Sequence, residues 1–379
     1  MIETPERAAL AATMRQFTAR EVLPNLPAWE RAGEIPRETH RRIAKAGLYA
    51  IGFGEEIGGE GGDTVDMVLA TEAFLEAGGS SGAHAALFTH GIALPHIIAS
   101  GDQALIDRFV RPALAGELVC ALGITEPDAG SDVAHLRTTA VRDGDDYVVD
   151  GAKMFITSGV RADFVTTAVR TGGPGAAGIS LLVIEKDTPG FTVSRKLDKM
   201  GWLCSDTAEL SFTGCRVPAR NLIGPENAGF ALIGQVFVPE RIIAAVHAYS
   251  VAQRCLDLTL SYVRQRATFG KPVVSRQVVQ HKLVQMRQRI ELARTYTREV
   301  ARRHAAGEFV AGEVCLAKNA AVDACKYVVD EAVQLHGGMG YMRESEVERH
   351  YRDSRILGIG GGATEVMTDL AAKIFGYGR

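Results

Sequence analysis

Residues 314–335 read VCLAKNAAVDACKYVVDEAVQL, and apolar side chains recur in this segment at every third or fourth position from Val314 to Leu335. This period places them on one face of a long α-helix. Residues 242–263 and 283–300 show the same period, and a shorter segment of this kind covers Thr364–Phe375. Helices with one apolar face bury those faces against one another, so we predict an antiparallel four-helix bundle as the C-terminal domain, residues 224–379.

The N-terminal part of the chain is predicted to be helical as well. Five of its segments are rich in Ala, Leu and Ile, and Gly or Pro residues separate them. We therefore expect an all-α N-terminal domain over residues 1–117. The segments are Glu6–Val22, Arg37–Ala46, Val65–Ala77, His84–Ser100 and Gln103–Ala115.

Between these helical parts the sequence has the character of β-strands. Short β-branched or aromatic runs are separated by turn-forming pairs such as Asp143-Gly144 and Asp150-Gly151. We expect a central antiparallel β domain over residues 118–223, which makes the chain an α+β multi-domain protein. The predicted strands are Tyr147–Val149, Lys153–Thr157, Phe164–Val169, Ile179–Glu185, Phe191–Ser194 and Glu209–Phe212.

The overall composition is that of an ordinary globular protein. Of the 379 residues, 46% are hydrophobic and 23% are charged, and the formal net charge is −3. These values exclude a disordered chain, a collagen and a coiled coil, and they argue against nucleic acid or an anionic membrane as the main ligand. The six cysteines include no Cys-x-x-Cys pair, so we expect them to be reduced core residues.

Signals for export or membrane insertion are not apparent in the sequence. The first residues, MIETPERAAL, lack the apolar core of a signal peptide, and no apolar run approaches the roughly 18 residues of a membrane span. We therefore expect a cytoplasmic protein without a membrane span.

Two glycine-rich matches to known motifs are set aside. Residues 78–82 (GGSSG) match a nucleophile elbow, but that motif must follow a strand, and Val65–Ala77 is predicted to be a helix. Residues 358–363 match the dinucleotide pattern GxGxxA, which requires an acidic residue about 20 positions later, and only sixteen residues follow Ala363. No ATP-binding or zinc-ligand motif occurs either, so no metal site is predicted.

The loop at residues 125–132, TEPDAGSD, is the first candidate binding element. It follows the apolar run Val119–Ile124, and a loop of this kind directs hydroxyl groups and free backbone N–H groups toward one place. Such donors suit a polar heterocycle or a carbonyl oxygen. A capped turn without any ligand explains the same residues equally well.

Together with other motifs, this loop resembles the acyl-CoA dehydrogenase family, whose architecture is also α, β, α. The resemblance implies bound FAD, oxidation of an acyl-CoA to the trans-2-enoyl thioester, and transfer of the electrons to an electron-transfer flavoprotein. It also implies a role in fatty acid β-oxidation and a homotetramer built as a dimer of dimers. The motifs occur in family order: TEPDAGSD (125–132), MFITSG (154–159), KMGWLCSDTAEL (199–210), RATFGKP (266–272), VQHKL (279–283), QLHGGMGYM (334–342) and YRDSRILGIGGGATEVM (351–367).

The flavin site of the family matches residues of the central domain. The resemblance places the hydroxyl groups of Thr125 and Thr157 against the flavin ring, and Ser131 beside the thioester channel. Phe155 stands where many relatives carry Trp, so an aromatic plate against the flavin is kept while an indole N–H is lost.

Further cofactor positions match the C-terminal domain. Arg266 and Phe269 correspond to the pair that, in the family, reaches the FAD diphosphate and adenine of a neighbouring subunit. Arg suits this role because its guanidinium group forms a bidentate fork to phosphate. Gln334, Gly337 and Gly338 correspond to a segment along the same cofactor, where glycine allows a close backbone approach.

Dehydrogenation requires a base for the α-proton while hydride leaves the β carbon for flavin N5. A carboxylate in a dry pocket suits this task because burial raises its pKa toward the working range. Many family members carry the base in a Tyr-Glu-Gly-Thr loop, but the matching position here is Gly361. Pro239-Glu240-Arg241 instead matches the long-chain and isovaleryl branch, in which the base lies at the start of a C-terminal helix. The resemblance therefore assigns Glu240 as the base, and Arg241 and Gly361 to the substrate side.

The same residues also have a simpler interpretation. A Glu in the first helical turn after a Pro, as predicted for Glu240, is favoured on protein surfaces by the helix dipole alone. Under the catalytic interpretation, Gly361 frees volume opposite Glu240, and its backbone N–H is available for the thioester carbonyl. Ala363 departs from the Thr that is common in this loop, so we expect one flavin or phosphate contact to be lost or shifted to Thr364.

Other functions remain open at this point. The chain could be a flavin oxidase of the same superfamily, or a non-catalytic or partner-dependent subunit of a mixed tetramer. The presence of Glu240 argues against a non-catalytic subunit, which has no need of a base. A carrier-protein thioester could replace the CoA thioester. The position of the base favours long or branched acyl groups by analogy.

Overall fold

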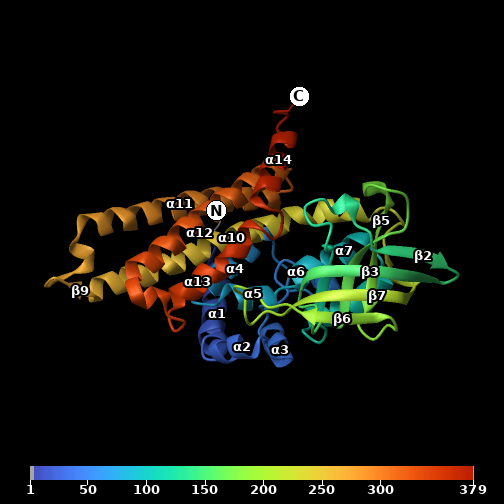
Figure 1. Ribbon diagram of the computed structural model, residues 1–379, viewed down its shortest axis with the longest axis horizontal. Coiled ribbons are helices and arrows are strands. Elements are labelled where there is room, and N and C mark those ends of the chain that lie inside the picture. Colours follow the sequence, from blue (N-terminus) through green and yellow to red (C-terminus); the bar gives the residue numbers. More distant parts are fainter. Residues whose placement is uncertain (1–3, 379) are drawn as a thin grey trace.

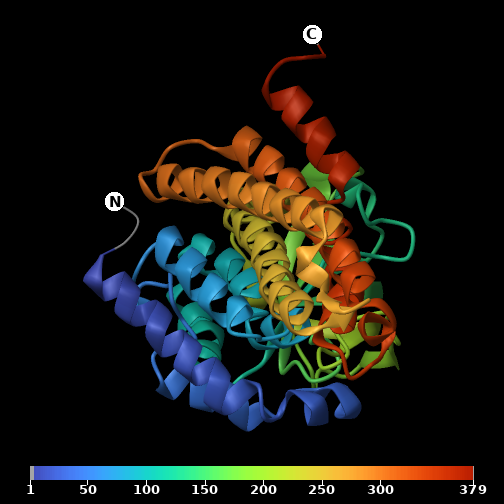
Figure 2. The same ribbon diagram turned by 90° about the vertical axis from the view of Figure 1, so that its left-hand side faces the viewer.

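The structure is a computed structural model that describes residues 4–378. It confirms the three predicted parts in chain order: N-terminal helices, a central β-sheet and C-terminal helices (Figure 1). The long C-terminal helices follow the longest axis of the molecule, and the sheet lies at one end of them. The N-terminal helices pack along their side (Figure 2).

The N-terminal helices are short, and local signals in the sequence start several of them. The first residue of α4 (Thr64–Glu76) follows a capping box, in which the side chains of Asp63 and Asp66 bind each other's backbone N–H groups. The remaining helices of this part are α1 (Pro5–Phe17), α2 (Leu26–Ala32), α3 (Arg37–Lys45), α5 (Ser81–Leu87), α6 (His90–Ala93), α7 (Pro95–Ser100), α8 (Gln103–Leu105) and α9 (Arg111–Leu114).

One predicted helix is broken in the structure. Residues 84–100 do not form a single helix but parts of α5, α6 and α7. The chain leaves helical geometry at Phe88, and Pro95, which lacks an N–H group, begins a new helix. Sequence analysis also missed the short helix α2.

The central sheet has the strand order β6-β7-β3-β2-β4-β5-β8, and β1 pairs with β4. It is antiparallel as predicted, except that β1 runs parallel to β4 and one residue pair joins β2 to β4 in parallel. β4 and β5 are buried on both faces because a hydrophobic cluster packs on each side. The strands are β1 (Cys120–Gly123), β2 (Thr139–Asp143), β3 (Asp146–Thr157), β4 (Phe164–Arg170), β5 (Ile179–Glu185), β6 (Phe191–Lys196), β7 (Thr207–Pro218) and β8 (Leu222–Ile223).

The expected turn at Asp150-Gly151 is wrong, because β3 continues through it as one long strand. Gly151 has φ +149°, and a Cβ atom there would lie 2.5 Å from Thr138 Oγ1. The glycine therefore allows a close approach between chain segments, not a reversal of direction. The pairing of β3 with β7 shifts register between Val149 and Gly151, as at a β-bulge.

Between residues 224 and 378 the structure has three long α-helices and two shorter ones. α10 packs against α4, α11 and α12, whereas α14 packs against α12 and leads the C-terminus away from the body of the molecule (Figures 1 and 2). The elements are α10 (Gly229–Gln265), the hairpin of β9 (Ala267–Thr268) and β10 (Lys271–Pro272), α11 (Gln277–Ala305), α12 (Ala311–His336), α13 (Glu346–Ser354) and α14 (Thr364–Ile374).

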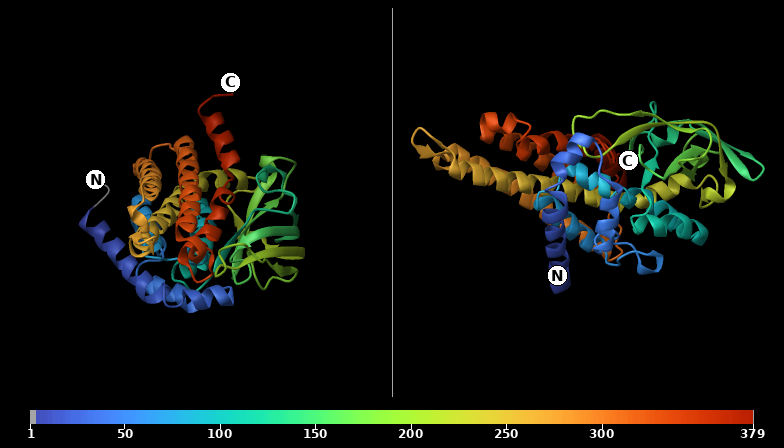
Figure 3. Two further views of the ribbon diagram at one scale, coloured as in Figure 1. Left: turned by 60° about the vertical axis from the view of Figure 1, so that its left-hand side comes forward. Right: turned by 90° about the horizontal axis from the view of Figure 1, so that it is seen from below.

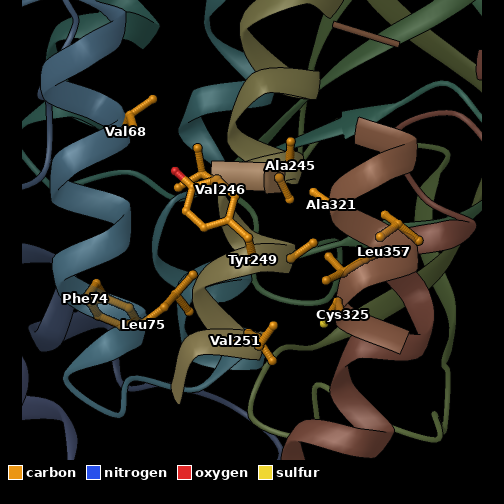
Figure 4. Close-up of a cluster of buried hydrophobic side chains, with 14 of the residues drawn as sticks. Val68, Phe74, Leu75, Ala245, Val246, Tyr249, Val251, Ala321, Cys325 and Leu357 are labelled. Carbon is orange, nitrogen blue, oxygen red and sulfur yellow. The ribbon is translucent and has the colours of Figure 1, made fainter. Parts of the chain in front are cut away.

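The main hydrophobic core lies where α4, α10 and α12 meet. Figure 4 shows Phe74 of α4, Val246 and Tyr249 of α10, and Cys325 of α12 within it. α4 thus completes the packing of the long C-terminal helices, which the pattern within residues 224–379 did not reveal. All six cysteines are buried and free, as expected of reduced core residues.

α10 connects the two ends of the molecule. It begins beside β5 and ends at the β9–β10 hairpin (Figures 1 and 3). Its length and a mean hydropathy of 1.5 over an 18-residue window meet the usual criteria for a membrane span, which corrects the expectation that no such run exists. In this fold the helix is the central helix of the bundle and contributes many residues to the hydrophobic core.

Candidate active site

Glu240 lies inside α10, directly after a proline. The helix begins at Gly229 and continues through Pro239, so the expectation that Glu240 occupies the first turn of a helix is wrong. Pro239 has no N–H group and therefore cannot donate to the carbonyl one turn earlier, so the helix lacks one hydrogen bond at this point. The Glu240 side chain is partly buried and faces a loop from another part of the chain.

The facing loop is the glycine run between α13 and α14. A Cβ atom built on Gly361 would lie 3.2 Å from Glu240 Oε1, which is tighter than ordinary van der Waals contact. Gly361 has φ +62°, a conformation that residues with side chains rarely adopt. Glu240 therefore reaches the space that a side chain at position 361 would enter. This is the geometry expected if Glu240 replaces a base carried at position 361 in other family members.

The Glu240 carboxyl group is shielded from water and has two cations near it. Burial raises the pKa of Glu240, while the charges of Arg241 and Lys318 act in the opposite direction. A carboxyl group with a raised pKa is a better proton acceptor than an ordinary surface carboxylate. The surface interpretation of Glu240 does not fit this environment.

Lys318 is a site residue that sequence analysis missed. It is 1% exposed, and its Nζ donates to the carbonyl oxygen of Gly360 at 2.8 Å and also to that of Gly362. Burial lowers the pKa of Lys318 to about 8, against the opposing effect of Glu240. Its position on the apolar face of α12, one turn after Val314, was a signal in the sequence.

Arg241 and Thr364 lie beside this loop in different settings. The Arg241 guanidinium group is buried over the Phe237 ring at 4.8 Å, and its Nε has no hydrogen-bond partner among the described residues. Thr364 Oγ1 donates to the Gly358 carbonyl at 3.4 Å. Ala363 precedes the first residue of α14 and provides no side-chain cap. The predicted contacts of Arg241 and Thr364 with substrate or cofactor stay predictions.

A second cluster, formed by Thr125, Phe155 and Thr157, lies at the sheet. Phe155 is 61% exposed and has φ 61° at a register shift in β3, so the strand turns its aromatic ring outward. The Met154 N–H donates to the Thr125 carbonyl at 2.8 Å, which joins the TEPDAGSD loop to this strand. Thr125 and Thr157 are partly exposed on these two neighbouring segments. An exposed aromatic ring and hydroxyl side chains on adjacent segments suit a flat heterocycle.

Packing links this cluster to the Glu240 site. Ile124, the neighbour of Thr125, belongs to the hydrophobic cluster against which Phe237 of α10 packs. Phe237 in turn lies under the Arg241 guanidinium group. Ser131 is exposed in the same loop as Thr125. The TEPDAGSD loop and the part of α10 next to Glu240 therefore pack into one hydrophobic cluster.

The TEPDAGSD loop rests on a buried ion pair. Lys153 Nζ lies 2.7 Å from Glu126 Oε1, and the two side chains are 0% and 5% exposed. Lys153 also donates to the Ile124 carbonyl at 3.2 Å, and Glu126 accepts hydrogen bonds from the backbone N–H groups of Arg137 and Thr138. Neither residue of this pair was identified by sequence analysis, because only burial against each other distinguishes Lys153 and Glu126 from surface residues.

Arg266 and Phe269 lie far from the sheet. The β9–β10 hairpin that carries them is at the opposite end of the long axis from β3 (Figure 1). Both side chains are exposed, Phe269 to 96%. These residues therefore do not join Thr125 and Phe155 in one site within a single chain.

The end of α12 adds further predicted cofactor residues to this distant region. Gln334 is exposed, and no atom lies within 4 Å of the place where a Cβ atom would stand on Gly337 or Gly338. A cavity of about 230 Å³ lies next to them, lined in part by Tyr262 and His336, whose rings stack at 4.3 Å. A guanidinium group and exposed glycine N–H groups can donate hydrogen bonds to a diphosphate, and aromatic rings can stack on an aromatic base.

The GGSSG segment at residues 78–82, which matches a nucleophile elbow in sequence, lies within the helical core. Ser80 precedes α5 and caps it, and Ser81 Oγ lies 2.6 Å from His247 Nε2. Both Ser81 and His247 are buried, and burial keeps the pKa of His247 well below its usual value. Because the motif follows a helix and is closed to solvent, its rejection stands.

Comparison with known proteins gives a consistent result along the chain. Family models described as the N-terminal, middle and C-terminal domains of acyl-CoA dehydrogenase match residues 4–117, 121–215 and 227–375. The mitochondrial long-chain specific acyl-CoA dehydrogenase of Mus musculus is 37% identical over 95% of this chain and 84% of its own length.

Solved structures agree with these matches. A "probable acyl CoA dehydrogenase" from Mycobacterium abscessus is 63% identical, with a TM-score of 0.98 over 99% of this chain and 100% of that one. A glutaryl-CoA dehydrogenase from Mycobacterium smegmatis, solved in complex with FADH2, is 27% identical, with a TM-score of 0.92 over 99% of this chain and 95% of that one.

Proposed function

The chain belongs to the acyl-CoA dehydrogenase family, and we propose that Glu240 is the base of its reaction. The enzyme is an oxidoreductase that dehydrogenates acyl-CoA. The observation that carries the proposal is the approach of Glu240 Oε1 to within 3.2 Å of the Cβ position of Gly361. No other residue in that glycine loop brings a carboxyl group to this place, because residues 360–362 are all Gly.

In the proposed mechanism, Glu240 accepts the α-proton of the acyl thioester at a carboxylate oxygen. Burial of the carboxyl group strengthens it as a base, and an apolar acyl chain that excludes water strengthens it further. In this proposal the Gly361 N–H donates to the thioester oxygen, where negative charge develops as the proton leaves. FAD supplies the acceptor for the hydride that leaves the β carbon.

The described residues fit FAD in two separate halves. Thr125, Phe155 and Thr157 would hold the flavin, and the region of Arg266 and Gly337 would hold the diphosphate and adenine. The flavin residues lie at the sheet, and the diphosphate and adenine residues lie near the β9–β10 hairpin at the far end of the long helices (Figure 1). Because one chain does not bring them together, we propose that each cofactor site is shared by two subunits of a homo-oligomer. Closed symmetry would then complete every site in the assembly.

Shared sites predict complementation between two defective variants. Phe155→Ala removes the exposed aromatic plate, and Arg266→Ala removes the phosphate fork, so each variant alone should lose FAD on dialysis. In a homo-oligomer refolded or co-expressed from equal amounts of both, about a quarter of the sites should combine an intact Phe155 with an intact Arg266. The measurement is the ratio of flavin absorbance to protein. Flavin content no higher than the mean of the two single variants would contradict shared sites.

The raised pKa of Glu240 predicts the acid side of the pH profile. Only the ionised carboxylate accepts the α-proton, so kcat/KM should fall as the pH drops through the pKa of Glu240 in the free enzyme. That fall should lie above the value of about 4.3 typical of an exposed Glu. The check is kcat/KM against pH with an artificial electron acceptor. A profile that stays flat down to the ordinary Glu pKa would show that Glu240 is not the group that titrates.

We further propose long or branched acyl-CoA substrates and an electron-transfer flavoprotein as the acceptor. The position of the base on α10 and the likeness to a long-chain specific enzyme support the substrate class. The test is anaerobic bleaching of the flavin by a panel of short, long and branched acyl-CoAs, followed by reoxidation with either an electron-transfer flavoprotein or air. Rapid reoxidation by air would indicate an oxidase, and failure of every acyl-CoA to bleach would indicate a non-catalytic subunit or a carrier-protein substrate.

A further inference from the structure

Lys318 is the most unusual residue near the proposed base. Its ammonium group lies in the bundle core of α12, at 1% exposure, where a charged side chain is rarely found without a specific partner. Two of its three donors are used by the carbonyl groups of Gly360 and Gly362. These two carbonyl groups flank Gly361, the residue that faces Glu240.

These two hydrogen bonds determine how the glycine loop is oriented. Gly361 and Gly362 have φ +62° and +94°, so the run is free of the usual backbone restrictions and needs external contacts to hold one conformation. In a trans peptide the C=O and the following N–H point in opposite directions. By holding the Gly360 carbonyl, Lys318 therefore directs the Gly361 N–H away from itself and fixes the proposed donor to the thioester.

Lys318 also contributes charge at the base. The Cβ position of Gly361 is 3.2 Å from Glu240 Oε1 and 3.9 Å from Lys318 Nζ, so the two groups approach this one glycine from different helices. The other titratable or charged groups that act on Lys318 are Arg241 of α10 and Cys315 of α12. Cys315 is a buried thiol, and Arg241 carries the same sign of charge as Lys318. Arg241 and Lys318 thus both favour the ionised form of Glu240. Of the two, Lys318 is the one that donates hydrogen bonds to the glycine loop.

We propose that Lys318 is a positioning residue for the dehydrogenation: it holds the Gly360–Gly362 loop in its working conformation and places a positive charge near the Glu240 carboxylate. This inference rests on the proposed role of Glu240. It assigns to Lys318 two separable effects, one through hydrogen bonds and one through charge. Variants that remove one effect or both can distinguish them.

The experiment compares Lys318→Met with Lys318→Gln in the FAD-loaded enzyme. Met removes both the donors and the charge, whereas Gln keeps an N–H donor for the loop carbonyl groups and removes the charge. Because a nearby opposite charge lowers a carboxyl pKa by about one unit or more, both variants should move the acid limb of kcat/KM upward by about one pH unit. At pH values above that limb, Gln should retain a rate near that of the wild type, while Met should lose about tenfold or more in kcat.

Controls separate this inference from folding and from the role of Glu240. Lys373→Met, which removes an exposed lysine of α14, should change neither kcat nor the pH profile. Flavin content and circular dichroism report folding, and if Lys318→Met does not fold, the pH shift of Lys318→Gln carries the test. An unchanged acid limb in both variants would overturn the charge effect, and equal kcat in both would overturn the loop effect. If Glu240→Gln stays active, the proposed function itself fails, whatever the Lys318 variants do.

Discussion

Glu240→Gln should lower the rate of substrate-dependent flavin bleaching by about 10³-fold or more, while FAD binding and folding are retained. The amide has nearly the same shape as the carboxyl group but cannot accept the α-proton, and general bases typically contribute about 10²–10⁴-fold to a rate. No described residue of the glycine loop can replace it, because residues 360–362 are all Gly. The measurement is stopped-flow bleaching under nitrogen with a saturating acyl-CoA.

A matched control for this variant is Glu365→Gln. Glu365 is an exposed acid in the first turn of α14, close in sequence to the glycine loop, and its substitution should leave the bleaching rate unchanged. Bound product analogue should still perturb the flavin spectrum of Glu240→Gln, because the binding groups are intact. If Glu240→Gln bleaches at the wild-type rate, Glu240 is not the base.

Lys153→Met should destabilise the protein by about 3–5 kcal/mol, the usual cost of removing one partner from a buried ion pair. Lys153 is 0% exposed, and without it the Glu126 carboxylate would remain buried and lose the cation that lies 2.7 Å from it. Burial alone would raise the pKa of Glu126, but Lys153 and the hydrogen bonds from Arg137 and Thr138 more than offset this effect and lower it. The measurement is the free energy of unfolding in urea, followed at neutral pH.

Arg137→Ala is the matched control for Lys153→Met. Its ion pair with Asp128 spans 3.1 Å in the same region, but the two side chains are 79% and 69% exposed. An exposed pair of this kind contributes at most about 1 kcal/mol. Similar losses for both variants would show that burial does not set the strength of the Lys153–Glu126 pair. A larger loss for Lys153→Met should be accompanied by weaker FAD retention, since the TEPDAGSD loop rests on this pair.

The local part of the fold followed from short-range patterns. The period of three or four along residues 314–335 predicted α12, and the runs after residue 178 predicted β5, because these patterns reflect which face of an element is buried. The break near Phe88 and the continuity of β3 were missed. Both depend on distant neighbours: Gly151, for example, is a close approach to Thr138 and not a turn.

In the candidate site, too, local motifs predicted some residues, whereas contacts between distant segments revealed others. Family motifs led to Glu240 and Gly361, to the flavin residues, and to Arg266, and the structure confirms that Glu240 and Gly361 face each other. The roles of these residues stay predictions. Lys318 and the Lys153–Glu126 pair were not found, because a buried charge is recognised by its partners, and those partners come from other parts of the chain.

The sequence by itself determined the family, the α, β, α order, the reaction class and the identity of the candidate base, since these are carried by contiguous motifs and by the periods of helices and strands. Only the tertiary structure decided that Glu240 lies inside a long helix that continues through Pro239, and that Lys318 holds the loop opposite it. It also decided that the two sets of cofactor residues lie apart, one at the sheet and one near the β9–β10 hairpin. The physical reason is that distances, burial and the pKa shifts they cause arise between segments far apart in the sequence. A linear pattern records which residues are present, but not which of them meet.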